Sequence, residues 1–436
     1  MTRTRTEPTR SPQRTPARRD GTPAEGRARQ RALCIAATPD EGDLGELHEL
    51  LRTAGVAVVG ELVQRREHPH PNSYLGPGKL EELKALVATL DANVVACDDE
   101  LSPRQERTLE SELGIAVVDR TTIILDIFAQ HAGTAEGKLQ VELAQLEYNL
   151  ARMRGLWTHL ERLGGGVGTR GPGEAQIETD RRLARNRIAA LRRRLRDVHA
   201  SRAVMRGERE RSALPQVALA GYTNAGKSTL LNALTGASVT VADRLFQTLD
   251  PTTRQLEVAG RSYLLTDTVG FIRKLPHQLI DAFAATLEET IHAELILHVV
   301  DASADEEDVA AMMRAVEDVL EEIGAGDRPQ LLVLNKSDLL DDLGRTRAVN
   351  GHRDALLVSA ATGEGLDALR GRIDELFVAQ RSTIELLLPY SEGARLAELH
   401  ELAGELERED TAEGVRVRAL LTAAQAARFA RFAGVA

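Results

Sequence analysis

An octapeptide with the composition of a phosphate-binding loop lies near the middle of the chain: Gly221-Tyr222-Thr223-Asn224-Ala225-Gly226-Lys227-Ser228. Its glycines allow a tight turn whose backbone N–H groups point inward at a β-phosphate. Lys227 can reach the outer phosphate oxygens, and the Ser228 hydroxyl can bind Mg²⁺. An apolar run precedes the loop, and Thr229 begins a helical pattern after it. The order strand, turn, helix therefore predicts that the chain binds a nucleoside triphosphate with Mg²⁺.

A second motif could select the base of that nucleotide. Asn335-Lys336-Ser337-Asp338 follows an apolar run and matches N-K-x-D. A carboxylate there can accept hydrogen bonds from guanine N1–H and N2–H₂, whereas adenine would leave it unpaired at a cost of about 1–3 kcal/mol. The Asn335 side chain can support the opposite edge of the base, and Lys336 can lie over its plane. A backbone amide of Ser359-Ala360-Ala361 can reach guanine O6. We therefore expect GTP or GDP to be preferred over adenine nucleotides.

Two further segments could surround the γ-phosphate and the metal. Asp267-Thr268-Val269-Gly270 is a D-x-x-G motif, in which Asp267 can hold Mg²⁺ through water and the Gly270 amide can bond the γ-phosphate. The first switch of a GTPase would lie in Leu245-Phe246-Gln247-Thr248-Leu249-Asp250-Pro251-Thr252-Thr253. One threonine of this segment should complete the Mg²⁺ shell, but the spacing does not choose among Thr248, Thr252 and Thr253.

The residue after Gly270 bears on catalysis. Ras-like enzymes have a glutamine there that orients the attacking water, whereas this chain has Phe271. Lys227 and Mg²⁺ can stabilise the charge of the transition state, but a phenyl ring cannot position water. We therefore expect slow intrinsic hydrolysis and a binding partner that completes the catalytic geometry.

These motifs require an α/β scaffold, and the pattern of the chain predicts an α/β fold in several domains. Residues 1–31 carry nine arginines and few apolar residues, which predicts a disordered extension, either a solvated tail or an arm that touches nucleic acid. Residues 32–135 alternate strands (32–37, 56–64, 94–97 and 115–119) with helices (44–54, 79–90 and 102–113). This predicts a small parallel α/β domain. Its glycine-rich turn at 74–79 is either a simple loop or an anion site.

Heptad spacing predicts an antiparallel coiled-coil hairpin over residues 136–212. One seam runs from Leu139 to Leu160, and a second from Ala184 to Val198. Between them, the loop at 163–174 holds six glycines and is longer than a turn between helices needs. It is either an inert flexible loop or a probe that contacts RNA. In the second case, the contacting residues would be Gly164, Gly165, Gly166, Gly168, Arg170, Gly171 and Gly173, with twelve arginines of 181–211 extending the contact.

The rest of the chain is expected to form a P-loop GTPase domain at 213–380 and a small α+β domain at 381–436, with strands at 383–388 and 414–421 and helices at 393–408 and 422–433. The net charge of −11 argues against general polyanion binding, so contact with nucleic acid should be local. No apolar run approaches the ~20 residues that span a bilayer. The two cysteines, Cys34 and Cys97, are expected to be buried thiols. We expect a monomer in the cytoplasm, with a fraction at the inner face of the membrane.

Over residues 32–380 the chain resembles the HflX family of ribosome-associated GTPases. The family motif G-Y-T-N-A-G-K-S-T is matched by Gly221 to Thr229, F-x-T-L-D-P-T by Phe246 to Thr252, D-T-V-G-F-I-R by Asp267 to Arg273, and N-K-x-D by Asn335 to Asp338. Outside these motifs, Gly164 to Glu174, Glu136 to Ala144, Asp119-Arg120 and Ile124 to Ala129 are also similar to the family. The arginine-rich extension before Ala32 departs from the family pattern.

The resemblance implies a function more specific than spacing alone. Thr248, in the F-x-T-L position, would be the Mg²⁺-binding threonine, which makes Lys227, Thr248 and Gly270 the expected catalytic residues. The partner would be the large (50S) ribosomal subunit and its rRNA, with the hairpin reaching toward the peptidyl-transferase region. The activity would be GTP-dependent splitting or rescue of stalled ribosomes, stimulated by the ribosome, with some ATP hydrolysis as well.

Two other functions compete with this one. The chain could be a GTP-switched assembly or dormancy factor that occupies the 50S subunit without splitting ribosomes. It could instead be an RNA-modifying GTPase, which would need a cofactor site or a reactive cysteine near RNA. Both cysteines lie in strand-like apolar runs, which disfavours the RNA-modifying enzyme.

Overall fold

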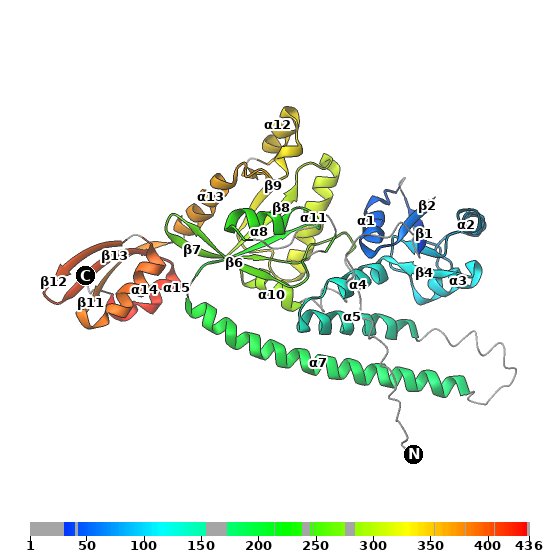
Figure 1. Ribbon diagram of the computed structural model, residues 1–436, viewed down its shortest axis with the longest axis horizontal. Helices are drawn as coiled ribbons and strands as arrows, with labels where there is room; N and C mark the ends of the chain where they lie inside the picture. The colour runs from blue at the N-terminus through cyan, green and yellow to red at the C-terminus, as the bar shows by residue number, and fades with distance from the viewer. Residues whose placement is uncertain are drawn as a thin grey trace, which may run out of the picture.

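The computed structural model describes residues 30–39, 42–153, 172–212, 214–237, 245–246, 248–274, 284–352, 354–379, 381–404 and 406–433. A central unit that contains the phosphate loop lies between an amino-terminal unit and a small carboxyl-terminal unit (Figure 1). Two long helices, α5 and α7, run along one side of this arrangement. The structure confirms the predicted α/β class: a parallel amino-terminal sheet, a helical hairpin, a P-loop unit and a small α+β unit at the carboxyl end. The exact domain limits remain a prediction.

The amino-terminal unit is a parallel sheet of four strands in the order β2-β1-β3-β4, as the alternating pattern predicted. Apolar clusters lie on both faces of the sheet, which is why β1 reads as an almost unbroken apolar run. The elements are β1 (Arg31–Thr38), α1 (Gly45–Ala54), β2 (Ala57–Arg65), α2 (Pro77–Leu90), β3 (Val94–Cys97), α3 (Pro103–Leu113) and β4 (Ala116–Asp119).

Two local features of this unit were open or unassigned in the sequence. In the glycine-rich turn, the Gly76 N–H donates to Gln64 Oε1 at 2.8 Å, and Tyr74 is fully buried, as expected of a loop built into the core. Helix α4 (Arg120–His131) was not assigned from the sequence. Asp119, the last residue of β4, caps this helix: its side chain accepts a hydrogen bond from Thr122 N. The strand therefore continues directly into the helix, and no loop residues in the sequence indicate where the helix begins.

The predicted hairpin is present as α5 (Ala135–Met153) and α7 (Pro172–Ser212), which lie side by side and run in opposite directions (Figure 1). Its seam buries Leu143 against Ile188, Leu191 and Leu195, which confirms the heptad spacing over these residues. Trp157 and Leu160, also predicted for the seam, lie outside the described residues.

The central unit is a six-stranded sheet in the order β10-β9-β8-β5-β7-β6, in which β6 alone is antiparallel to its neighbour. Helices cover both faces, as parallel strands require. The elements are β5 (Gln216–Gly221), α8 (Lys227–Thr235), β6 (Thr252–Val258), β7 (Arg261–Asp267), α10 (Ala284–His292), β8 (Leu295–Asp301), α11 (Glu306–Glu322), β9 (Gln330–Asn335), α12 (Asp342–Gly351), β10 (Leu356–Leu357) and α13 (Leu366–Ala379).

The carboxyl-terminal unit corrects one expectation. The helix predicted over 393–408 ends at Ala403, and Leu406–Thr411 is a third strand, which pairs with the middle strand of the sheet. This strand was missed because it is an edge strand rich in charged residues, which carries little β signal. The elements are β11 (Ser382–Leu388), α14 (Gly393–Ala403), β12 (Leu406–Thr411), β13 (Gly414–Leu421) and α15 (Ala423–Arg428).

Candidate functional site

The predicted nucleotide motifs meet at one edge of the central sheet. Strands β5, β7 and β9 are parallel, so their carboxyl ends bring Gly221, Asp267 and Asn335 to the same side. Open α/β sheets bind their ligands at this edge, because the loops that follow the strands gather there. The sequence order of the motifs thus becomes a single site in three dimensions.

Close contacts explain both glycines of the phosphate loop. A β-carbon at Gly221 would collide with the backbone oxygen of Val299 on the neighbouring strand. Gly226 has φ +91°, and a β-carbon there would collide with the side-chain amide of Asn335. Any side chain at either position would push the loop off its supporting strands, so the loop requires glycine at both.

Lys227 is a buried ammonium group at the start of α8. Its Nζ donates to the backbone oxygens of Gly221 at 3.0 Å and Tyr222 at 2.9 Å. Burial lowers the pKa of Lys227 from 10.5 to about 8, and the charge of Asp267 partly opposes this shift. Beneath the loop, burial first and Lys227 second lower the pKa of His298 to about 4. The loop therefore holds its lysine in a dry environment, where an anion would interact with it strongly.

Three oxygen ligands of the kind that Mg²⁺ prefers are gathered beside this lysine. Ser228 Oγ lies 2.8 Å from Thr248 Oγ1 and donates to Asp267 Oδ2 at 2.5 Å. Asp267 is fully buried, and burial raises its pKa. Within the described residues, its other oxygen, Oδ1, has no hydrogen-bond partner. These hydroxyl and carboxylate oxygens fit a Mg²⁺ ion completed by water and phosphate oxygens.

The D-x-x-G segment lies directly on the phosphate loop. Thr223 N donates to Phe271 O at 2.7 Å, and Phe271 N donates to Gly221 O at 3.1 Å. A β-carbon at Gly270 would come within 3.1 Å of Lys227 Nζ, which places the Gly270 backbone beside the lysine. The Phe271 side chain is fully buried in the core, so it does not face the reacting phosphate.

The remaining residues of this segment have structural contacts. Thr268 Oγ1 donates to Leu219 O at 2.6 Å, and the Val269 side chain is buried in the apolar core. Their predicted contact with the nucleotide is therefore left to their backbone atoms.

At the base-binding end, the N-K-x-D residues are linked to the loops around them. Asn335 Nδ2 donates to Ala225 O at 2.8 Å, and its Oδ1 accepts from Ala360 N at 3.0 Å. Asn335 thus links the phosphate loop to the 359–361 segment. The Ala360 N–H, one of the amides predicted to reach guanine O6, donates to Asn335 in this structure. Asp338 Oδ1 accepts from Ser359 Oγ at 2.5 Å. Lys336, with φ +67°, pairs with Asp301 at 2.6 Å.

Several predicted nucleotide-binding residues direct their side chains elsewhere. The Tyr222 hydroxyl donates to Glu46 of α1 at 2.5 Å. Phe246 packs edge-on against Phe128 of α4, with ring centroids 4.6 Å apart. Leu249 is buried in the same core, and Asp250 accepts hydrogen bonds from the start of α5.

The remaining predicted residues belong to the first switch and to the glycine-rich loop of the hairpin. Gln247 and the tip residues 164–171 lie outside the described residues. Gly173 falls in the first turn of α7.

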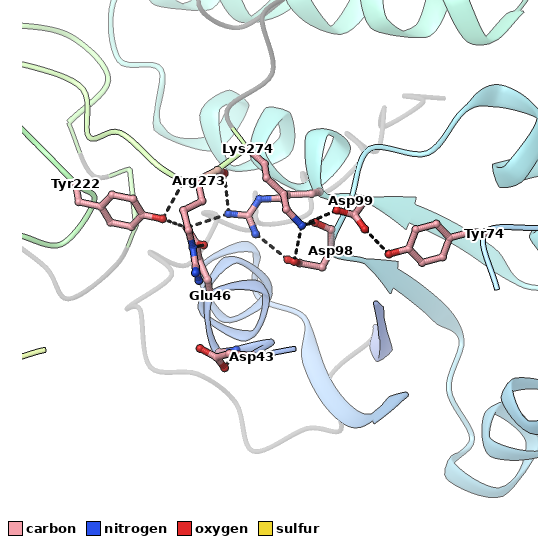
Figure 2. A network of polar contacts seen from close by, with 10 residues as sticks. Asp43, Glu46, Tyr74, Asp98, Asp99, Tyr222, Arg273 and Lys274 are labelled. Carbon is pink, nitrogen blue, oxygen red and sulfur yellow. Dashed lines mark hydrogen bonds and ion pairs between the residues drawn. The ribbon is translucent and has the colours of Figure 1, made fainter. Parts of the chain in front are cut away.

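A network of charged residues, not found from the sequence, joins this site to the amino-terminal unit (Figure 2). Arg273 Nε donates to Glu46 at 3.0 Å, and Lys274 pairs with Asp98 at 3.2 Å and Asp99 at 2.5 Å. Arg120, nearly fully buried, bonds Glu46 at 2.9 Å, Asp98 at 2.8 Å and the backbone oxygen of Arg273 at 3.1 Å. In the sequence, the two successive cations Arg273 and Lys274 after D-T-V-G-F-I could have indicated such a network. Their partners lie more than 150 residues away in the chain, so the sequence does not reveal them.

Comparisons with known proteins agree with this arrangement. The family model described as GTP-binding GTPase N-terminal matches residues 41–129, GTP-binding GTPase Middle Region matches 131–209, and 50S ribosome-binding GTPase matches 216–336. The chain is 48% identical to GTPase HflX of Lacrimispora saccharolytica, over 89% of this chain and 93% of that protein. The chain belongs to the HflX GTPase family. It is also 46% identical to GTPase HflX of Escherichia coli strain K12, over 87% of this chain and 90% of that protein.

The family resemblance found in the sequence is thus confirmed, and with it the class of enzyme, a GTPase. Among solved structures, the chain is similar to a GTP-binding protein from the archaeon Sulfolobus solfataricus in complex with GDP. That similarity has a TM-score of 0.42 and 26% identity, over 80% of this chain and 98% of that one. Within the described part of the chain, no helix is both long and apolar enough to cross a membrane.

Proposed function

We propose that this HflX-family GTPase binds the large ribosomal subunit and splits or rescues stalled ribosomes, with GTP hydrolysis stimulated by the ribosome. One observation carries the proposal: the P-loop, D-x-x-G and N-K-x-D segments lie at one edge of the central sheet, and the D-x-x-G segment is followed by a fully buried Phe271. The buried phenyl ring of Phe271 cannot orient water, so the enzyme needs a partner to reach full activity. The description of the matching family model, 50S ribosome-binding GTPase, supports the ribosome as that partner.

In this proposal each residue of the site has a defined task. The backbone of Gly221 to Ser228 and the Lys227 ammonium bind the phosphates, and Asp338 binds guanine. Ser228, Thr248 and, through water, Asp267 hold Mg²⁺, which when bound neutralises phosphate charge. The Gly270 amide senses the γ-phosphate. The short distances among Ser228, Thr248 and Asp267 support these assignments.

The hairpin is the part proposed to touch rRNA. The described part of α7 exposes a series of arginines that do not belong to the buried seam, and two of them, Arg187 and Arg192, pair with glutamates of α5. The others can contact phosphates along the stalk, which adds affinity that depends on salt. The exposed residues of this series are Arg182, Arg185, Arg187, Arg192, Arg193, Arg194 and Arg196.

Sedimentation of 70S ribosomes with this protein tests the proposal. With GTP we expect dissociation into subunits, and with 50S subunits alone we expect GTP turnover to rise about tenfold or more, well within the ~10⁵-fold that partners give other GTPases. A non-hydrolysable analogue separates binding from turnover. If 50S binding requires GTP but 70S ribosomes stay intact, the protein is an assembly or dormancy factor. If 50S subunits neither bind nor stimulate, the proposal is wrong.

A deletion tests the glycine-rich tip. Replacing residues 164–173 by a short turn should leave GTP affinity unchanged but abolish stimulation by 50S subunits, because the seam that folds the hairpin stays intact. A second variant replaces Arg170 alone by Ala, which should weaken ribosome binding partially, and less so at high salt. If 50S subunits still stimulate GTP turnover by the deletion variant, the glycine-rich tip has no role in that stimulation.

A further inference from the structure

The first switch is attached to the hairpin helix through one carboxylate. Asp250 lies two residues after Thr248, and its Oδ2 accepts hydrogen bonds from Gly133 N at 3.2 Å and Thr134 N at 2.9 Å. Its Oδ1 accepts a third hydrogen bond from the Thr134 hydroxyl. A carboxylate that accepts several N–H and O–H bonds at the start of a helix is favoured by both hydrogen bonding and the helix dipole.

The start of α5 is shaped to receive this carboxylate. Thr134 caps the helix, because its Oγ1 accepts from Gly137 N at 2.9 Å. A β-carbon at Gly137 would lie only 2.8 Å from Asp250 Oδ1, and one at Gly133 would lie 3.3 Å from Oδ2. Glycine in a helix is unfavourable relative to alanine. The space that Gly137 leaves for Asp250 accounts for a glycine in the first turn of α5.

The attachment lies close to the metal-binding oxygens. Between Asp250 and Thr248, Leu249 is buried in the core shared with the amino-terminal unit. Thr248 Oγ1 in turn lies 2.8 Å from Ser228 Oγ. The two residues that follow Thr248 therefore restrain it: Leu249 is buried, and the carboxylate of Asp250 is anchored.

We infer that Asp250 is a positioning residue: by binding the start of α5, it holds Thr248 at the Mg²⁺ site and makes closure of the first switch depend on the hairpin. The inference rests on the GTP and Mg²⁺ binding proposed above and not on the ribosome. GTP carries the γ-phosphate that Thr248 can contact together with the metal and GDP lacks it, so the anchor should favour GTP over GDP. By linkage, GTP binding must then strengthen the attachment of α5 by the same factor.

Three variants of the full-length chain test this inference: Asp250→Ala, Gly137→Ala and the double variant. Without the anchor, we expect the ratio of GTP-analogue to GDP affinity, measured with Mg²⁺ and fluorescent nucleotides, to fall about fivefold or more. GDP affinity without Mg²⁺ should not change. Gly137→Ala should lower this ratio and the melting temperature in the parent chain. It should lower the melting temperature less in the Asp250→Ala background, where Thr134 Oγ1, at 3.2 Å, is the remaining atom closer than 3.4 Å to the new β-carbon.

Gly371→Ala in α13 is the matched control, since a β-carbon there meets nothing within 4 Å. It should raise the melting temperature without changing the nucleotide ratio. If Asp250→Ala does not fold, Asp250→Asn, which keeps one acceptor oxygen, should give a smaller loss. An unchanged affinity ratio in the Asp250 variants, or stabilisation by Gly137→Ala in the parent chain, would overturn the inference. If the parent chain itself binds neither GTP nor GDP, the proposed function is wrong, whatever the variants show.

Discussion

At the scale of single residues, the phosphate loop depends on a charge kept out of water. Lys227 bonds two backbone oxygens of its own loop, and burial lowers its pKa to about 8. Below this pH the ammonium form persists at a cost to the stability of the nucleotide-free protein, and that cost is relieved as the pH rises toward 10.5. Phosphate oxygens would favour the charged form, so nucleotide binding and protonation of Lys227 are linked.

This linkage gives a pH dependence. Because the neutral amine must take up a proton to bind phosphate, GDP affinity measured without Mg²⁺ should weaken about fourfold between about pH 7 and 8.5. Asp267→Asn removes the charge that raises the pKa of Lys227, so the decline should begin at a lower pH in that variant. A GDP affinity that stays flat over this range would show that Lys227 keeps its charge through some other contact.

At the scale of elements, the hairpin depends on a narrow apolar seam. Leu191 is fully buried between α5 and α7, whereas its neighbours Arg192, Arg193 and Arg194 are exposed. The described seam has few members, and three of the α5 leucines that pack against it are only partly buried. Each buried leucine therefore contributes a large share of the packing between the two helices.

Leu191→Ala should separate α7 from α5 at a cost of about 2–3 kcal/mol. We expect faster amide hydrogen exchange in the seam of α5 while the melting transition of the central unit stays in place, because the opening is local. Arg194→Ala, exposed on the same helix, should change stability by no more than about 0.5 kcal/mol. Equal exchange in both variants would contradict the role given to the seam.

At the scale of the whole molecule, the nucleotide site and the amino-terminal unit are joined by a network of charged residues around the buried Arg120. The network in Figure 2 connects Tyr222 of the phosphate loop and Arg273 after the D-x-x-G motif with Glu46. Arg120, the first residue of α4, pairs with both Glu46 and Asp98. Both segments of the nucleotide site therefore contact the amino-terminal unit directly.

Arg120→Met tests this connection. It leaves two largely buried carboxylates short of a partner, with an expected loss of about 3 kcal/mol and a thermal unfolding profile that splits into two transitions in calorimetry. Arg418→Met removes an exposed pair with Glu385 and should leave the unfolding profile essentially unchanged. A single unshifted transition in the Arg120 variant would mean that apolar contacts alone hold the units together.

The sequence by itself determined the nucleotide chemistry and the heptad seam. Both depend on residues close in sequence: a glycine loop, the ends of strands and a seven-residue spacing. The tertiary structure alone decided what Tyr222, Phe246 and Asp250 contact. Their partners, Glu46, Phe128 and Thr134, come from more than 110 residues away and leave no local pattern. For the same reason Gly137 reads as an ordinary helix glycine until the carboxylate it accommodates is seen.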